Sequence, residues 1–404
     1  MQAIIPLNGV VQYYDWGGFQ YLPELLSTPN PEHRPFAELW MGTHKKGTAK
    51  AILPDGDISL AALIDQNPVQ ILGQEVATYF QARLPFLFKI LDVRKMLSIQ
   101  AHPTKKSAES GYQHENEKGI PLDAFHRNYR DDNHKPEVMV ALTDFWLLHG
   151  FQSAEAIATT LRKVPAFEEL QSVFTSRDIK ALYQYIMELP QEKVDSLLSP
   201  LRQELDEKAA KKPHDKSSPD YWASLAFEDY TRDGHYDRGI FSIYFFNLVF
   251  IPKGQGIFQD AGVPHAYLEG VNVELMANSD NVFRGGLTPK HVDVPELLKH
   301  LVFTPVVPKI LEGEKENAIE TNFSTPAPDF ALSQLSFSAE NSKLIKKELS
   351  TAAIYIVMEG TIAVACEGKK TTFNQGDIFL IPAQQQLDIQ SEGVALLFSA
   401  KAGL

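Results

Sequence analysis

The chain has 404 residues, of which 44% are hydrophobic and 22% charged, and its formal net charge is −13. This length predicts about two or three domains with an ample core, and no apolar run approaches the ~18 residues that a membrane helix needs. The acidic balance disfavours a nucleic-acid surface, which requires broad positive potential, whereas an anionic small substrate would require a local cluster of Lys and Arg.

The first 80 residues predict short strands and turns followed by a helical segment. Residues 1–60 are rich in turns, and Trp16 stands directly before two glycines. A large aromatic side chain usually anchors a core, so Trp16 either supports a sheet or forms a wall for a sugar ring. Residues 59–80 are typical of a helix that Pro68 interrupts.

The next two segments predict strands with polar side chains in unusual places. The run from Leu84 to Val93 is mostly apolar and indicates a buried strand, but it contains Lys89. Lys89 lies either at an edge, with its stem turned outward, or inside a pocket. In the following strand Ser98, Gln100 and His102 share one face, because side chains alternate with period two. That face is either exposed or directed into a cavity that could bind a metal.

Glu137 opens a strongly apolar strand. Pro136 favours extended geometry before it, and a carboxylate at the mouth of a buried strand is costly unless it is paired or ligates a metal. His134 and Lys135 add two titratable groups immediately before it.

Residues 152–232 change from a strand pattern to a helical one. Apolar residues recur at helical spacing, Ser153 and Asp178 are candidate N-caps, and residues 208–219 are typical of a charged linker. From Ile240 to Pro252 the pattern again favours a strand. We therefore expect a helical insertion within a mainly β protein.

The segment 254–290 contains the densest set of candidate functional residues. A glycine, a short apolar strand and the run Gly262-Val-Pro-His265 resemble the second motif of the cupin superfamily, in which a hairpin presents histidine to the inside of a jelly-roll barrel. Residues 271–276 alternate as a half-buried strand, and the following loop contains Asp280, Arg284 and Lys290.

The C-terminal part also resembles cupin strands, from Ile354 to Ala383. It has glutamines at 384–386 where the first copy has His265, and no histidine follows His300. We therefore expect a second barrel without metal.

Four potential ligands come from three predicted strands: Gln100, His102, Glu137 and His265. Two imidazoles, a carboxylate and an amide oxygen suit a divalent ion such as Zn²⁺, one per chain, with an open position for water. The cations Lys89, Lys135, Arg284 and Lys290, with Ser98, could surround the same mouth. In an acidic protein such a cluster predicts an anion site, and phosphate is the commonest anion.

Two long runs are similar to the signatures of type I mannose-6-phosphate isomerases. They are Tyr129-x-Asp131-x-Asn133-His134-Lys135-Pro136-Glu137, and His265-Ala-Tyr-Leu-x-Gly through Glu274-x-Met-Ala-x-Ser-Asp-Asn281 to Arg284-x-Gly-x-Thr-Pro-Lys290. Gln100-Ala-His102-Pro103 and Ala37-Glu-Leu-Trp-Met-Gly42 also resemble that family. One departure is Gly285, where the family pattern has Ala, and we expect its missing methyl to loosen the loop slightly.

The resemblance implies zinc-dependent, reversible conversion of D-mannose 6-phosphate into D-fructose 6-phosphate through a cis-enediol, with Gln100, His102, Glu137 and His265 as metal ligands. Arg284 is our choice for stabilising the enediolate, because it keeps its charge. The catalytic base stays open among Asp280, His134 and Lys135. Lys89, Ser98 and Lys290 are assigned to the phosphate and Trp16 to the sugar.

We expect two cupin-type jelly-roll barrels plus a helical domain, in a mainly β fold. Residues 1–151 and 233–312 form the catalytic metal-binding cupin domain, 152–232 the helical insertion, and 313–404 the C-terminal cupin-like domain without metal. Two alternatives are an Fe²⁺ cupin oxygenase and a non-catalytic sugar-binding bicupin. The single cysteine, Cys366, excludes an intramolecular disulfide, and the first residues lack a signal-peptide pattern, so we expect a cytoplasmic monomer.

Overall fold

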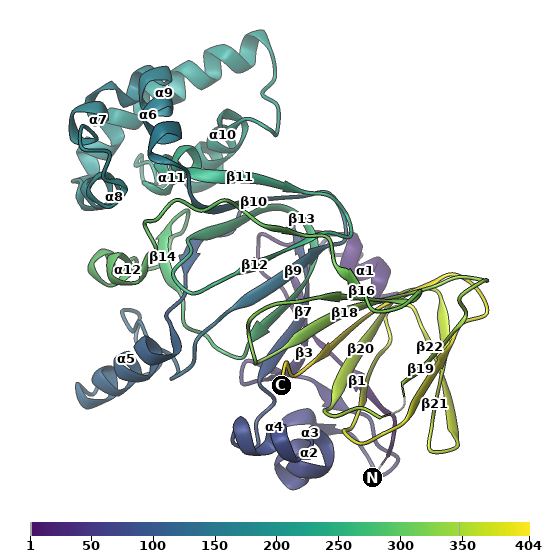
Figure 1. Cartoon of the computed structure of the whole chain (residues 1–404). Coiled ribbons are helices and arrows are strands. Elements are labelled where there is room, and N and C mark those ends of the chain that lie inside the picture. Colours follow the sequence, from purple (N-terminus) through teal and green to yellow (C-terminus); the bar gives the residue numbers. More distant parts are fainter. Residues whose placement is uncertain (1, 347) are drawn as a thin grey trace.

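The computed structural model describes residues 2–346 and 348–404, with more residues in strands than in helices. Figure 1 shows a cluster of helices at one end, a large twisted sheet in the middle, and the C-terminal strands at the opposite end. Among the described residues, no helix is both long and apolar enough to cross a membrane.

The central sheet is antiparallel and is organised around β13 (His265–Ala277). Residues 265–269 pair with β10, and residues 270–277 pair with β7 and β9. The change of partner occurs at Gly270, whose φ of 129° is a conformation that other residues rarely adopt. One strand therefore links two parts of the sheet.

The strands of this sheet are β2 (Val10–Gln12), β3 (Glu38–His44), β4 (Gly47–Thr48), β7 (Phe86–Val93), β8 (Ile99–Ala101), β9 (Glu137–Ala141), β10 (Phe145–Phe151), β11 (Phe246–Ile251), β12 (Gly256–Gln259), β13, β14 (Phe283–Gly286) and β15 (Ile310–Leu311). The expected buried strand from Leu84 to Val93 is confirmed as β7, and Glu137 does open β9.

Two further sheets form the C-terminal part. One has the order β16 (Glu314–Lys315), β17 (Glu320–Phe323), β18 (Ala331–Phe337), β25 (Ala395–Lys401), β20 (Ala353–Glu359), β23 (Ile378–Ile381), β1 (Ile5–Asn8), β5 (Lys50–Ala51) and β6 (Ile58–Ser59). The other has the order β19 (Lys343–Lys346), β24 (Leu387–Gln390), β21 (Thr361–Cys366) and β22 (Lys369–Asn374). Tyr355, Phe373 and Phe379 stack between them, with ring centroids 4.9 and 4.3 Å apart. Aromatic side chains thus fill this interior.

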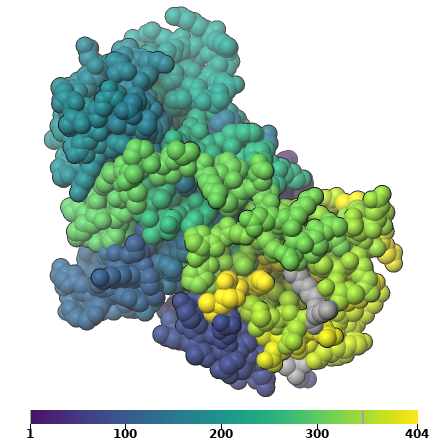
Figure 2. Space-filling model, viewed as in Figure 1, coloured from purple at the N-terminus to yellow at the C-terminus, as the bar shows by residue number. Residues whose placement is uncertain are grey.

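The N-terminal strand β1 belongs to the C-terminal sheet, because it pairs with β23 on one side and β5 on the other. One continuous sheet therefore contains strands from both sides of residue 313, where we expected the C-terminal domain to begin. The amide of Ala383 also donates to the carbonyl of Ile71 at 2.9 Å. Figure 2 shows the dark-blue helices of this N-terminal region packed against the yellow C-terminal residues.

The helical insertion is built around buried residues such as Phe167, Leu198 and Trp222, and this core continues into the central sheet, for example at Phe283. Its helices are α6 (Ala154–Lys163), a 3₁₀ turn (Pro165–Phe167), α7 (Glu168–Val173), α8 (Ile179–Glu188), α9 (Gln191–Lys211) and α10 (Pro219–Tyr230). Ser153 and Asp178 cap α6 and α8, as expected. The linker predicted from residue 208 was placed too early, because α9 continues to Lys211.

The strand predicted to begin at Ile240 is wrong over its first half. Residues 239–245 form α11 (Gly239–Phe245), and only then does β11 begin. Every residue of α11 is buried, so its apolar run has neither the helical nor the strand periodicity that would distinguish the two.

The remaining helices lie around the sheets: α1 (Tyr21–Leu25), α2 (Leu60–Gln66), α3 (Pro68–Leu72), α4 (Gln74–Tyr79), α5 (Lys105–Glu117) and α12 (Val294–His300). The helix interrupted at Pro68 is confirmed as α2 to α4, with Pro68 at the first position of α3.

Candidate active site and metal centre

Three of the four predicted metal ligands converge inside the central sheet. One possible ligand atom each from His102, Glu137 and His265 lies within 4.8 Å of the others. The Nε2 atoms of His102 and His265 lie 3.5 and 3.2 Å from the two carboxylate oxygens of Glu137. All three side chains are buried. Strand pairing explains why the three side chains converge. Strand β8 ends just before His102, β9 begins at Glu137, and both strands pair with β13, which begins at His265.

The fourth ligand, Gln100, lies beside this cluster. It stands opposite His265 in the pairing of β8 with β13, and paired residues place their side chains on the same face. Gln100 is half-buried and lines the cavity described below.

The chemistry of the cluster fits a metal ion. Nδ1 of His102 donates to the carbonyl of Asn281 at 2.8 Å, and Nδ1 of His265 donates to that of Val263 at 3.0 Å. Both Nε2 atoms are therefore left as acceptors directed at Glu137, and each is buried without a hydrogen-bond partner. Burial, with the positive charge of Lys135, lowers the pKa of His102 to about 4, which keeps the imidazole neutral as a metal ligand must be.

Glu137 is held ionised. Burial alone would raise the pKa of this carboxyl group, but attraction to Lys135 and His102 outweighs burial and lowers its pKa well below the usual range. The Nζ atom of Lys135 lies 2.8 Å from Glu137 Oε1. The site therefore presents two imidazoles and a carboxylate, a set that suits Zn²⁺.

A cavity of about 1110 Å³ opens beside the cluster. It is lined by these predicted site residues: Trp16, Lys89, Ser98, Gln100, Lys135, Asp280, Arg284 and Lys290. Trp16 stacks on Tyr14 with ring centroids 5.8 Å apart, and it also packs against the apolar interior of the sheet. Both functions considered for Trp16, core support and cavity wall, therefore apply.

Lys89 points into the protein interior, but it is engaged by carboxylates. Its Nζ atom lies 2.9 Å from Glu274 and 3.5 Å from Glu38. Burial opposes the charge of Lys89, yet these two carboxylates outweigh burial and raise its pKa. One cation facing two anions leaves a net negative environment, so the structure does not place Lys89 in a phosphate clamp, as the sequence suggested. The sequence left open whether Lys89 lies at an edge or inside a pocket, and it did not indicate these two partners.

A different set of cations gathers at the mouth of the cavity. The pKa of Lys290 is lowered by partial burial and by the charges of Arg284, Lys46 and Arg130. The pKa of Arg284 is lowered by burial and by Arg130. Within the described part of the chain, Arg284 and Lys290 have no carboxylate at ion-pair distance. An anion bound here would relieve this mutual repulsion.

Sequence reasoning missed Lys46 and Arg130. Each had a signal: Arg130 stands inside the first signature, and Lys46 follows two residues after His44 in a Gly-bounded run. Neither signal showed that both side chains would reach the loop of Lys290.

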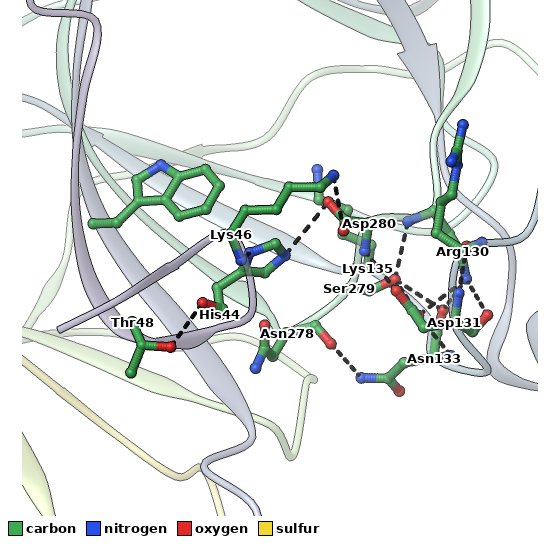
Figure 3. Close-up of polar contacts among 12 residues, drawn as sticks. His44, Lys46, Thr48, Arg130, Asp131, Asn133, Lys135, Asn278, Ser279 and Asp280 are labelled. Atoms are coloured by element: carbon green, nitrogen blue, oxygen red, sulfur yellow. Dashed lines mark hydrogen bonds and ion pairs between the residues drawn. The ribbon is translucent and has the colours of Figure 1, made fainter. Parts of the chain in front are cut away.

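Asp280 is paired at the same mouth (Figure 3). Its carboxylate lies 3.4 Å from Nε2 of His44 and 3.0 Å from Nζ of Lys46. Burial would raise the pKa of Asp280, but His44 and Lys46 together lower it well below the usual range. Asp280 therefore stays ionised and is a weak base.

His134 does not reach the cavity. Its Nε2 atom lies 2.9 Å from the buried carboxylate of Asp329 in the C-terminal part. Because His134 and Lys135 are adjacent in extended chain, their side chains point in opposite directions, and only Lys135 lines the cavity. The suggestion that His134 acts as the base is therefore not supported by the structure.

The two signature segments are joined by hydrogen bonds (Figure 3). Asp131 accepts hydrogen bonds from the Ser279 hydroxyl and the Asp280 amide, both at 2.7 Å. Asn281 accepts from the Arg130 amide at 2.7 Å and donates to the Asp131 carbonyl at 2.8 Å. These bonds fix the loop of Asp280 against the loop that leads to Lys135.

Tyr129 connects the first signature to α12. Its hydroxyl donates to Glu296 and lies 2.7 Å from Nε2 of His300. Hydrogen bonding from His300, with Lys299 and Tyr129, lowers the pKa of Glu296 to about 2 despite partial burial.

This shift predicts an acid-sensitive contact. Because the folded pKa of Glu296 is about 2 and its ordinary value is 4.5, the contact stabilises the fold fully above pH 4.5 and is lost as the pH falls towards 2. Glu296→Gln should therefore show a smaller fall in Tm over this range than the wild type, measured by scanning calorimetry. The exposed Glu168→Gln on α7 is the matched control. Equal slopes for wild type and Glu296→Gln would contradict the prediction.

Comparison with known proteins agrees with this geometry. A family model described as the catalytic domain of type I phosphomannose isomerase matches residues 4–154. The mannose-6-phosphate isomerase of Salmonella typhimurium is 35% identical over 382 residues, covering 93% of this chain and 94% of that protein. The human mannose-6-phosphate isomerase is 33% identical, covering 96% of this chain and 95% of that protein.

The chain belongs to the type I mannose-6-phosphate isomerase family.

Solved structures of this family superimpose over the whole chain. A zinc-bound mannose 6-phosphate isomerase has a TM-score of 0.88 at 33% identity, with complete coverage of both chains. The Salmonella typhimurium enzyme bound to fructose 6-phosphate and zinc has a TM-score of 0.87 at 33% identity, also with complete coverage.

The departure from the family pattern at Gly285 does not leave free space. A methyl group added at Gly285 would meet Cγ2 of Ile99 and the hydroxyl oxygen of Tyr183, each at 3.0 Å. Tyr183 comes from α8 of the helical insertion and is fully buried. The expected loosening of the loop is therefore wrong, because the Tyr183 hydroxyl fills the space of the missing methyl.

The close approach of Tyr183 to Gly285 predicts that substitutions at these two positions are energetically coupled. Gly285→Ala should lower the free energy of unfolding by about 1–3 kcal/mol, the usual cost of overpacking a rigid core. Tyr183→Phe removes the obstructing oxygen and only a long hydrogen bond with Ser242, at 3.4 Å. In the Tyr183→Phe background Gly285→Ala should thus cost less, with a coupling of at least about 0.5 kcal/mol. Denaturant unfolding of the wild type, the two single variants and the double variant measures this coupling energy. Additive effects would show that the two side chains do not compete for space.

Proposed function

We propose that the protein catalyses the reversible isomerisation of D-mannose 6-phosphate and D-fructose 6-phosphate, with one Zn²⁺ per chain. The observation that supports this most strongly is the His102–Glu137–His265 cluster, with both Nε2 atoms unpartnered, beside a cavity whose mouth gathers cations. Family membership supports the same reaction. No observation favours the oxygenase or the non-catalytic alternative.

His102, Glu137, His265 and Gln100 are proposed to hold the ion. When bound, Zn²⁺ supplies a Lewis acid that polarises a sugar oxygen near the reacting carbons. The phosphate is proposed to bind at the mouth beside Lys290, which has no carboxylate at ion-pair distance among the described residues, with Ser98 on the cavity wall. Trp16 provides an apolar face for the sugar.

The proton transfer from C2 to C1 is proposed to use Lys135, which can take the C2 proton only as a free amine, so its ammonium group must first release a proton. Its Nζ atom lies in the cavity lining, 2.8 Å from Glu137, and so next to where the polarised sugar oxygen would stand. Asp280 is a weaker candidate, because His44 and Lys46 stabilise its ionised form. Arg284 would then stabilise the negative charge of the enediolate, because a guanidinium keeps its proton.

Three finer features belong to the same proposal. The antiparallel pairing around β13 and the two C-terminal sheets that enclose an apolar interior support two cupin-type jelly-roll barrels. The unbroken series of helices within residues 152–232 supports a helical insertion between residues 1–151 and 233–312, followed by residues 313–404. The single cysteine, Cys366, is consistent with a cytoplasmic protein, and we propose that it acts as a monomer.

The decisive experiment is a coupled assay with mannose 6-phosphate, using zinc-replete protein with and without a chelator. We expect turnover that the chelator abolishes and added Zn²⁺ restores. Inactivity of the zinc-replete protein would reject the isomerase, and turnover that persists in the chelator would reject the role of the metal.

A further inference from the structure

The turn between Arg284 and Lys290 has an unusual backbone. Gly286 has a φ of 124°, and Leu287, which has a side chain, has a φ of 52°. The left-handed region is unfavourable for leucine, so surrounding contacts must hold this residue there. There is also no room at Gly286, because an added Cβ would lie 2.5 Å from the Cα of Gly239.

Asp237 provides the contacts that hold this turn. Its Oδ1 atom accepts a hydrogen bond from the Leu287 amide at 2.8 Å, and its Oδ2 atom accepts one from the Thr288 amide at 3.2 Å. Oδ1 also accepts from the Gly239 amide at 2.7 Å, which fastens the start of α11 to the same carboxylate. The turn and α11 are therefore packed backbone against backbone, with one carboxylate shared between them.

The turn determines where two cavity cations lie. Arg284 precedes the strained residues on β14, and Lys290 follows them, with its amide donating to the Thr288 hydroxyl at 3.1 Å. Both side chains line the cavity, together with Leu287 and Thr288. A change in the conformation of Leu287 would redirect the chain between the two cations.

We propose that Asp237 is a positioning residue for the phosphate end of the substrate, which it serves by holding residues 286–288 in the conformation that aims Lys290 at one anion. This inference rests on the proposed function, because it takes the anion to be the substrate phosphate. Asp237 itself lies in the segment that returns from the helical insertion, so the insertion supports the binding loop as well as its own core.

The test uses the full-length, zinc-replete protein and two substitutions. Asp237→Ala removes every acceptor, whereas Asp237→Asn keeps one oxygen for Leu287 and Gly239 and loses the acceptor for Thr288. We expect Asp237→Ala to raise both the Kd of inorganic phosphate, measured by calorimetry, and the KM for mannose 6-phosphate by about tenfold, the order expected when a binding group is slightly misplaced. The value of kcat should change less, and Asp237→Asn should lie between wild type and Asp237→Ala.

The matched control is Asp178→Ala. Asp178 also accepts a backbone hydrogen bond at a helix start, from the Ala181 amide at 3.1 Å, but it caps α8 and does not line the cavity. The Asp178→Ala substitution should lower Tm without changing the Kd of phosphate.

If the Asp237 variants are folded, as judged by circular dichroism, and bind phosphate as the wild type does, then Asp237 is only a structural cap and the inference is overturned. A wild type that converts mannose 6-phosphate but binds no inorganic phosphate would also overturn it, whereas a wild type without turnover would overturn the proposed function instead. If Asp237→Ala does not fold, the Kd and KM of Asp237→Asn decide.

Discussion

His265→Ala is expected to abolish metal binding and to lower kcat by about a thousandfold, equivalent to ~4 kcal/mol of lost transition-state stabilisation. The Nε2 atom of His265 is buried without a hydrogen-bond partner, and it lies 3.2 Å from Glu137. Without it, the proposed ligand set keeps a single imidazole, His102, with the Glu137 carboxylate and the amide oxygen of Gln100, which is a much weaker set for Zn²⁺. His265 is not part of the apolar core that the helical insertion shares with the sheet, so the insertion should remain folded.

Metal content by mass spectrometry, kcat by the coupled assay and circular dichroism test this expectation together. His235→Ala is the matched control, because His235 is an exposed histidine that lies 2.7 Å from Asp195 in the helical region. It should keep one metal ion per chain and full activity. Retention of one zinc per chain by His265→Ala would refute the ligand set, even if activity were lost.

The metal ligands could be predicted from sequence because their positions follow local rules. Period-two alternation puts Gln100 and His102 on one face, and the cost of burying a carboxylate singles out Glu137. His265 follows a Gly-x-Pro turn that resembles the cupin motif. The structure brings the side chains of His102, Glu137 and His265 together because the strands at or beside them all meet at β13.

Charge partners could not be predicted, because they depend on which strands pair. The sequence left open whether Lys89 points outward or into a pocket, and only the pairing of β7 with β3 and β13 places Glu38 and Glu274 around it. Likewise, alternation separates His134 from Lys135 without showing which one faces the cavity. The partner of His134, Asp329, lies 195 residues further along the chain.

Local departures from a pattern were equally hard to interpret from sequence. The loss of a methyl at Gly285 indicates a looser loop when only the loop is considered. The structure places Tyr183, a residue about a hundred positions away, in that space. The helix at Gly239–Phe245 was missed for a related reason: burial on all sides removes the periodicity that a sequence-based prediction needs.

Arg284→Ala is expected to lower kcat by about 10²–10³-fold, the usual cost of removing one fixed group that stabilises an oxyanion. Arg284 is half-buried at the cavity mouth, where its pKa is lowered by burial and by Arg130, so its charge has no compensating carboxylate. Negative charge that develops on the enediolate would gain most from such a group in a water-poor site. Arg284→Lys should recover only part of the activity, because lysine lacks the planar, multidentate donor set.

Lys290→Ala distinguishes this role from simple phosphate binding. Lys290 is exposed at the mouth and follows the turn that Asp237 holds. Its loss should cost about 1–3 kcal/mol of substrate-binding free energy, which raises KM and leaves kcat nearly unchanged. Arg284→Ala should show the opposite division, with kcat falling further than KM rises. Steady-state kinetics of both variants in both reaction directions provides the comparison. If Arg284→Ala raised only KM, its guanidinium would belong to the phosphate site, and the enediolate would have to be stabilised by the metal centre and Lys135.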